Sequence, residues 1–286
     1  MPLPTGINPR PGALRSLRLG EHTVTVVPDG AVQLHPRRWL PDSTDRDWAG
    51  DHAGVLDEQG YIGTSVAGLL VEYDGRALLL DAGFGPHDIP AEQTIDTIGA
   101  LHGGQLPEAL AQTGRAPADI EAVAFTHLHD DHIGWAFRPG PDRSSPFAGA
   151  ALLASAGEWD GWPVPPDAAT RARPVTPGEE IFPGVTAWAT PGHTRGHLSY
   201  VISGGGQRLI AFGDVFHTSA QLSRPDWRVS MDALPEQAVR TRHEMLAELT
   251  RPDTLAFANH FAQGQLGRVT PSGGAARWEP LLEDPA

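Results

Sequence analysis

The sequence predicts a single domain, residues 1–286, that combines β-sheets with helices in an α/β or α+β fold. Several short apolar runs are rich in strand-forming residues, and four of them lead directly to a histidine or an aspartate. One segment near the C-terminus, 232–249, instead has the spacing of an amphipathic helix. A chain of 286 residues is long enough to bury a substantial core.

The N-terminal region is predicted to form an arm followed by strands. Residues 1–20 contain arginines among Pro and Gly, which is typical of an arm. Residues 22–27 alternate as a first strand, and Pro28-Asp29-Gly30 predicts a turn after it. Residues 66–73 and 76–80 are predicted to pair as a hairpin, because Asp74-Gly75 between them is a strong hairpin signal.

Residues 31–62 are the least regular part of the sequence. They hold Trp39, Trp48 and Tyr61 among Pro, Asp and Gly. A loop of this length in a compact domain is usually functional or disordered. Two interpretations stay open, a flap over a functional site and a packed surface loop.

The remaining elements follow from local signals. Residues 106–113 predict a short helix, and 114–119 lead into a strand at 122–125. Residues 133–147 are predicted to form a second loop, which carries Trp135 and Phe137. For the helix at 232–249, Asp232 is the expected cap and Pro235 lies in the first turn.

The apolar run 122–125 is followed by the pattern H-x-H-x-D-H, formed by His127, His129, Asp131 and His132. If the strand continues into the pattern, His127 and His129 point to the same face. A turn at Asp130 would then bring Asp131 and His132 to the same space. Imidazole and carboxylate at this spacing suit zinc. The alternative is a solvated strand-to-helix loop.

Three more candidate ligands follow strand-like runs later in the chain. His193 follows 185–189, Asp214 follows 209–211, and His260 follows 254–257. Functional groups often lie on loops at the ends of strands. The order of these residues favours a metal site over the solvated loop.

The order H-x-H-x-D-H, His, Asp, His resembles the dinuclear ligand set of the metallo-β-lactamase fold superfamily, over about residues 24–269. The resemblance implies an αβ/βα sandwich of four layers, in which two mixed sheets pack face to face and helices lie outside. The layout of 213–217, 224–227 and 259–261 is similar to the lactonase and methyl-parathion-hydrolase-like branch.

The resemblance also assigns roles to residues. It implies that His127, His129 and His193 hold one divalent ion, that Asp131, His132 and His260 hold a second, and that Asp214 bridges the two, most simply as Zn²⁺ ions. Asp81 would orient a ligand imidazole. His197, in the superfamily's G-H-x-x-G-H pattern, would be a structural hydrogen-bonding residue.

The function implied is hydrolysis of an ester or lactone by a metal-bound hydroxide. Metal binding lowers the pKa of the parent water to about 7. Asp131 could transfer the released proton. His217 stands where acyl-homoserine lactonases of this superfamily carry a catalytic tyrosine, so it is either a hydrogen-bond donor to the substrate or a bystander. Trp39, Trp48, Trp135 and Phe137 would suit an apolar acyl or aryl group.

Composition narrows the partners. The formal net charge of −14 argues against nucleic acid. All 21 basic residues are arginine and cysteine is absent, which disfavours glyoxalase II enzymes and zinc β-lactamases that use lysine or cysteine. No stretch predicts a membrane span or a signal peptide, so a cytoplasmic location is expected. The expected partner is a small-molecule substrate, and a homodimer stays open.

Other functions of the same fold remain alternatives. They are a thioesterase, a phosphotriesterase, a β-lactam hydrolase, and an oxidoreductase with one iron that resembles persulfide dioxygenases. A binding protein with a vestigial site is a further alternative. Two metals per chain with hydrolysis would favour the first group, whereas one iron with oxygen uptake would favour the oxidoreductase.

Overall fold

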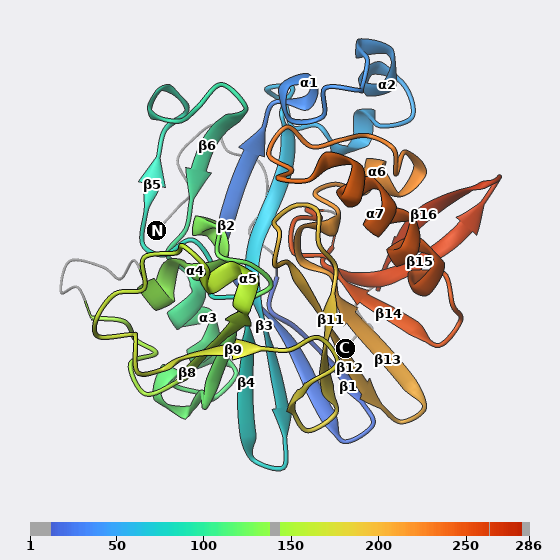
Figure 1. Cartoon of the computed structure of the whole chain (residues 1–286). Coiled ribbons are helices and arrows are strands. Elements are labelled where there is room, and N and C mark those ends of the chain that lie inside the picture. Colours follow the sequence, from blue (N-terminus) through green and yellow to red (C-terminus); the bar gives the residue numbers. More distant parts are fainter. Residues whose placement is uncertain (1–12, 138–143, 263, 282–286) are drawn as a thin grey trace.

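A computed structural model describes residues 13–137, 144–262 and 264–281 of the chain. Two β-sheets pack against each other, and helices lie on their outer sides (Figure 1). This is the four-layer arrangement that the sequence analysis expects. Residues 1–12 of the predicted arm lie outside the described residues. The prediction is wrong for its later part, because residues 15–19 form a strand.

The first sheet is mixed and has nine strands in the order β5-β6-β2-β3-β4-β7-β8-β9, with β1 paired to β2. Strands β4, β7, β8 and β9 run parallel, and the other pairs are antiparallel. The strands are β1 (Arg15–Leu19), β2 (His22–Leu34), β3 (Ile62–Tyr73), β4 (Arg76–Leu80), β5 (Asp88–Ile89), β6 (Ile98–His102), β7 (Ala122–Ala124), β8 (Ala151–Ser155) and β9 (Ala172–Val175).

The second sheet is also mixed and has seven strands in sequence order, β10 to β16. Its one parallel pair among the described strands is β13 with β14, and a parallel pair requires a crossover, which contains the longest helix. The strands are β10 (Glu180–Phe182), β11 (Val185–Ala189), β12 (Leu198–Gly204), β13 (Gln207–Ala211), β14 (Thr254–Phe257), β15 (Leu266–Ser272) and β16 (Ala275–Pro280).

Helices cover the outer faces of both sheets. The α-helices are α1 (Pro36–Trp39), α2 (Asp45–Ala49), α3 (Leu106–Gln112), α4 (Asp130–Phe137), α5 (Ala156–Trp159), α6 (Ala220–Ser223) and α7 (Pro235–Leu249), and short 3₁₀ turns are η1 (Ala53–Val55), η2 (Ala91–Gln93), η3 (Pro117–Asp119) and η4 (Gly213–Val215). Helices α3 and α4 pack on the first sheet, and α7 packs on the second. Within the described ranges, no helix is both long and apolar enough to cross a membrane.

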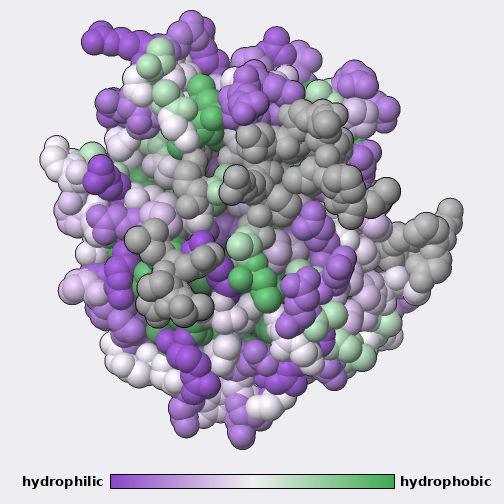
Figure 2. All heavy atoms as spheres, turned by 180° about the vertical axis from the view of Figure 1, so that it is seen from behind, coloured by the Kyte–Doolittle hydropathy of each residue, from purple (hydrophilic) through white to green (hydrophobic). Residues whose placement is uncertain are grey.

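The central core lies between the two sheets. Alternate residues of β2, β3 and β4, such as Val24, Leu69 and Leu78, pack with Tyr200 and Leu209 from the second sheet. On the face shown in Figure 2, described hydrophobic residues form small groups among hydrophilic ones. Among the described residues, the exposed large hydrophobic side chains are Leu14, Ile95 and Met231.

The predicted turn at Pro28-Asp29-Gly30 is wrong, because β2 continues to Leu34 through a β-bulge. A side chain at Gly30 would overlap the carbonyl of His102, so the close approach of β6 requires glycine. The hairpin at Asp74-Gly75 is confirmed. Both residues have positive φ, 46° and 77°, as a two-residue hairpin turn requires.

The segment 31–62 is largely ordered rather than irregular, since it contains the end of β2, then α1, α2 and η1. Trp39 and Trp48 are buried in it, and Trp48 packs on Trp227 at 5.5 Å between ring centroids. A role as a moving flap stays a prediction. The predicted loop at 133–147 is wrong for residues 133–137, which belong to α4, and 138–143 lie outside the described residues.

Candidate metal centre

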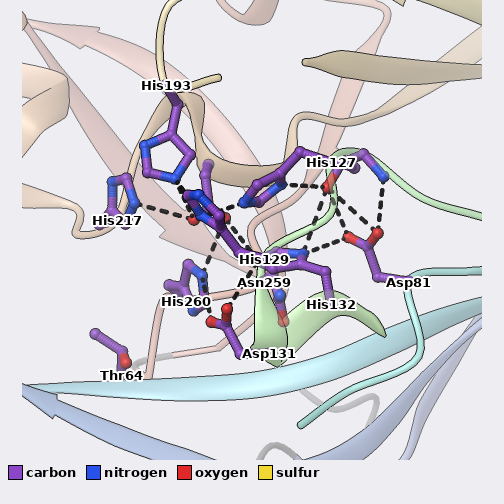
Figure 3. Close-up of polar contacts among 12 residues, drawn as sticks. Thr64, Asp81, His127, His129, Asp131, His132, His193, His217, Asn259 and His260 are labelled. Atoms are coloured by element: carbon purple, nitrogen blue, oxygen red, sulfur yellow. Dashed lines mark hydrogen bonds and ion pairs between the residues drawn. The ribbon is translucent and has the colours of Figure 1, made fainter. Parts of the chain in front are cut away.

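The seven predicted ligands lie together beyond the ends of strands from both sheets. Figure 3 labels six of them, the five histidines and Asp131, and shows their side chains converging. Each follows the C-terminal end of a strand: β7 precedes the H-x-H-x-D-H pattern, and β11, β13 and β14 precede the other three. The residues form two groups whose donor atoms lie within 4.8 Å of one another: His127, His129, His193 and Asp214 in the first, and Asp131, His132 and His260 in the second. The two groups match those implied by the sequence.

Asp214 lies between the groups, with one carboxylate oxygen toward each. Its Oδ1 is 3.1 Å from His132 Nε2 and 3.0 Å from His260 Nε2. Its Oδ2 is 3.3 Å from His193 Nε2 and 3.7 Å from His127 Nε2. This arrangement suits a bridging carboxylate.

The residues fit a pair of divalent ions. Donors around a tetrahedral zinc ion are about 3.3 Å apart, because Zn–N bonds measure about 2.0–2.1 Å. Here His129 Nδ1 lies 3.0 Å from His193 Nε2, and Asp131 Oδ2 lies 3.6 Å from His260 Nε2. Within the described residues, the buried atoms His127 Nε2, His132 Nε2 and Asp214 Oδ1 have no hydrogen-bond partner, which is unusual for buried polar atoms unless they bind an ion.

The local geometry of the H-x-H-x-D-H pattern differs from the prediction. Strand β7 ends at Ala124, so strand alternation does not align His127 and His129, and a helix rather than a turn begins at Asp130. Asp131 and His132 lie in the first turn of α4. This helix lies directly on the loop after Asp81, where a side chain at Gly134 would overlap the backbone of Phe84.

Hydrogen bonds from the opposite ring nitrogens orient three of the imidazoles. His132 Nδ1 donates to Asp81 Oδ2 at 2.8 Å, so the prediction for Asp81 is confirmed. His260 Nδ1 donates to the carbonyl of Ser65 at 2.9 Å. His193 Nδ1 lies 3.2 Å from Asp232 Oδ1. In each case the other ring nitrogen, Nε2, lies toward Asp214, where it could hold a metal ion.

Two of these orienting groups escaped sequence analysis. Asp232 is not the cap of α7, whose N-cap residue is Leu234, and it contacts His193 instead. The carbonyl of Ser65 carries no sequence signal. Both are distant in the sequence from the histidines that they contact: Asp232 is 39 residues from His193, and Ser65 is 195 residues from His260.

Glu158 of α5 is a further residue that sequence analysis missed. Its Oε2 accepts a hydrogen bond from the Leu128 backbone N at 3.0 Å, between His127 and His129. Its Oε1 accepts from the Gly196 backbone N at 3.1 Å and from the Thr194 hydroxyl. One carboxylate therefore joins the loop of His127 to the loop of His193.

His197 has the structural role expected from the sequence. Its Nε2 accepts a hydrogen bond from the Asp214 backbone N at 3.1 Å, and its Nδ1 lies 2.8 Å from the Thr190 hydroxyl oxygen. Burial lowers the pKa of His197 to about 3, so the ring stays a neutral acceptor. Burial acts to raise the pKa of Asp214, but nearby imidazoles, His260 first, hold it well below its usual range.

His217 also lies in the centre, although it is not among the two ligand groups. Its Nε2 is 3.0 Å from Asp214 Oδ2, and its ring stacks on His260 at 5.6 Å between centroids. Trp39 packs against its edge at 5.2 Å. The side chain is buried and lines the cavity next to the ligands. This position suits a group that meets a substrate.

A cavity of about 430 Å³ opens over the ligands. Much of its lining is apolar and comes from β2, α1, strands β5 and β6, and the segment that connects β5 to β6. These apolar residues are Leu34, Trp39, Ile89, Ile95, Ile98 and Leu101. The sequence analysis is right about Trp39 as a lining residue. It is wrong about Trp48, Trp135 and Phe137, which pack in the hydrophobic clusters instead.

Comparisons with known proteins agree with this geometry. Residues 62–260 match the family model of the metallo-beta-lactamase superfamily. Metallo-beta-lactamase domain-containing protein 1 of Xenopus laevis is 31% identical over 160 residues, which cover 55% of this chain and 60% of that protein. The human protein of that name is 30% identical over 197 residues, 66% of this chain and 67% of the relative.

Solved structures show the same fold. AidC, a dizinc quorum-quenching lactonase with a bound product, has a TM-score of 0.80 at 20% identity, covering 95% of this chain and 98% of that one. A protein from Staphylococcus aureus described as a probable metal-dependent hydrolase has a TM-score of 0.79 at 18% identity, covering 94% of this chain and 100% of that one. The family match spans more than half of the sequence, and the chain belongs to the metallo-beta-lactamase superfamily, whose members are mostly hydrolases.

Proposed function

We propose that this protein is a hydrolase with two divalent metal ions, most simply Zn²⁺, that cleaves a carboxylic ester or lactone. The observation that carries the proposal is Asp214, whose two oxygens face two separate groups of ligands beneath an apolar cavity. Bound metals of this kind polarise a substrate oxygen and lower the pKa of water to about 7. The dizinc lactonase AidC, which has the same fold, supports this class of reaction.

The residues around the cavity have distinct tasks in this proposal. Asp131 is 22% exposed in its side chain and lines the cavity, so it can take a proton from attacking water and deliver it to the leaving oxygen. His217 directs a ring nitrogen toward the same space and donates a hydrogen bond to the carbonyl or leaving oxygen. Trp39 holds the ring of His217 in place.

The cavity wall indicates a neutral, partly apolar substrate. The lining residues among those described include no arginine, and the chain has no lysine, so an anionic tag would lack a cationic partner there. Ile95 and Met231 are 55% and 42% exposed at this cavity and would contact an acyl or aryl group. A small molecule of this kind, rather than nucleic acid, is the proposed partner.

The test is a hydrolysis panel with protein whose metal content has been measured. The panel contains lactones, aryl esters, thioesters, phosphotriesters and β-lactams. Two metals per chain and highest kcat/KM on a lactone or ester are expected. Asp214→Asn should reduce tightly bound metal below two per chain, whereas the same change at half-buried Asp253, which is in neither ligand group, should not. One metal in both proteins, or preference for another substrate class, would overturn the proposal.

A further inference from the structure

Asp232 is a buried carboxylate with four hydrogen-bond contacts, between the second sheet's helix and the metal centre. Its Oδ1 lies 3.2 Å from His193 Nδ1. Its Oδ2 accepts from the Val229 backbone N at 3.1 Å and from both terminal nitrogens of Arg242 at 3.3 and 3.4 Å. The side chain is fully shielded from solvent. A carboxylate in such a place is stable as an anion only when it is paired.

Arg242 of α7 supplies the pairing charge. Its side chain is 1% exposed, and its Nε donates to the carbonyl of Pro225 at 2.9 Å. Burying both charges costs solvation energy, and the loss of one partner alone is strongly destabilising. The pair therefore holds an ionised carboxylate next to His193 rather than a neutral acid.

An ionised carboxylate can only accept hydrogen bonds, so His193 donates its Nδ1 proton to Asp232. In the neutral imidazole, which is the form that binds a metal ion, the lone pair is then on Nε2. That Nε2 lies 3.0 Å from His129 Nδ1 and 3.3 Å from Asp214 Oδ2. The proton position set by Asp232 is the one that lets His193 act as a ligand.

The segment that carries Asp232 also joins His193 to the cavity wall. Asp232 directly follows Met231, which lines the cavity. The backbone N of Ala233 donates to the carbonyl of His193 at 2.9 Å, and the backbone N of Ser230 donates to the carbonyl of Trp39 at 2.9 Å. A displacement of this wall would therefore reach the His193 ring through one connected set of bonds.

We infer that Asp232, paired with Arg242, is a positioning residue that fixes the proton of His193 on Nδ1 and links this ligand to the cavity wall. The inference rests on the metal pair of the proposed function. Its consequence is specific to the first ligand group, because the second group takes its orientation from Asp81 and Ser65.

The test is Asp232→Asn, in which the amide nitrogen can donate to Nδ1 and move the ring proton to Nε2. Long-range ¹H–¹⁵N NMR of metal-free protein at pH 8 reports the protonated nitrogen, with the His193 signals identified by their loss in His193→Gln. We expect Nδ1–H in the wild type and Nε2–H in the variant. Chelator competition should show one Zn²⁺ weakened by about 10- to 100-fold and the other unchanged.

Two further variants keep the test decisive if Asp232→Asn folds poorly. Asp232→Asn with Arg242→Met removes both buried charges and should show the same proton shift and metal loss. Asp42→Asn removes the ion pair between Asp42 and Arg228, whose closest atoms are 2.5 Å apart, and should change neither result. A variant that keeps Nδ1–H and binds both ions with wild-type affinity would overturn the inference. If no substrate is hydrolysed but these results hold, only the proposed function fails.

Discussion

At the scale of single residues, His217 is deeply buried, its Nδ1 has no hydrogen-bond partner in the described part of the chain, and its Nε2 meets only the Asp214 carboxylate there, without hydrogen-bond geometry. A buried polar group in that state is costly unless a ligand or ion satisfies it. Its place beside Asp214 and at the cavity makes a substrate oxygen the natural partner. Sequence analysis found the residue only through its spacing from Asp214.

His217→Ala is expected to retain both metals and to lower kcat by about 10²–10³, the usual cost of losing one transition-state donor. KM should change less than kcat, because the bond forms mainly in the transition state. Steady-state kinetics on the best substrate, with metal analysis, measures both effects. Surface His243→Ala is the control. Full activity in His217→Ala would make His217 a bystander.

His197 should make the metal-free protein sensitive to acid. Its folded pKa is about 3, whereas an unfolded histidine titrates near about 6.5. Between these values the unfolded state binds an extra proton, so the free energy of unfolding falls as pH falls from about 6.5 to about 3. Above about 6.5 the contribution of neutral His197 is complete.

His197→Gln tests this dependence, because a glutamine oxygen can still accept from the Asp214 backbone N. The stability difference between wild type and variant should narrow as pH falls from 7 to 4, measured by urea unfolding of metal-free protein. A difference that stays constant over this range would show that His197 does not cause the acid sensitivity.

At the scale of elements, the sequence predicted most strands that deliver ligands and the single long helix α7. The apolar runs 185–189, 209–211 and 254–257 all lie in strands, because local pattern and burial agree there.

The prediction of a turn at Asp29 was wrong because contacts with distant parts of the chain override the local sequence signal. Its carboxylate accepts hydrogen bonds from the backbone N atoms of Phe84, Gly85, Gly104 and Leu106, and these distant loops stabilise a bulge within β2.

Helix α5 has four residues and still acts on the metal centre through Glu158. Glu158→Gln would place an amide nitrogen against a backbone N–H, either at Leu128 or at Gly196. We expect weaker Zn²⁺ binding at the first ligand group by about tenfold or more. Chelator competition measures the affinity. The matched control is Glu179→Gln, at a half-buried glutamate that also accepts from a backbone N, that of Thr176. Unchanged affinity would show that the two loops hold their positions without Glu158.

At the scale of the whole molecule, the two sheets are joined by polar contacts as well as by the apolar core. The hydroxyl of Tyr200 in β12 donates to the carbonyl of Phe125, beyond β7, at 2.8 Å. Both groups are buried, so their pairing could not be predicted from two separate sequence segments. The fold class, in contrast, was predictable because the order of ligands is characteristic of the superfamily.

Tyr200→Phe should lower the free energy of unfolding by about 1–3 kcal/mol, because the carbonyl of Phe125 loses its partner in a dry interior. Urea unfolding of metal-free protein measures the change. Half-buried Tyr61→Phe is the control. A loss no larger than that of the control would mean that the bond between the sheets adds little to stability.

The connection between β9 and β10, which is also the connection between the two sheets, separates the candidate metal ligands into two parts of the chain. Residues 176–178 there are exposed. A chain divided at this point would leave His127, His129, Asp131 and His132 on one fragment, and His193, Asp214 and His260 on the other. Each of the two ligand groups would be split. Two co-expressed fragments should therefore bind each other with higher affinity in the presence of Zn²⁺ than in the presence of a chelator. Metal binding would then stabilise the association of the two halves of the protein.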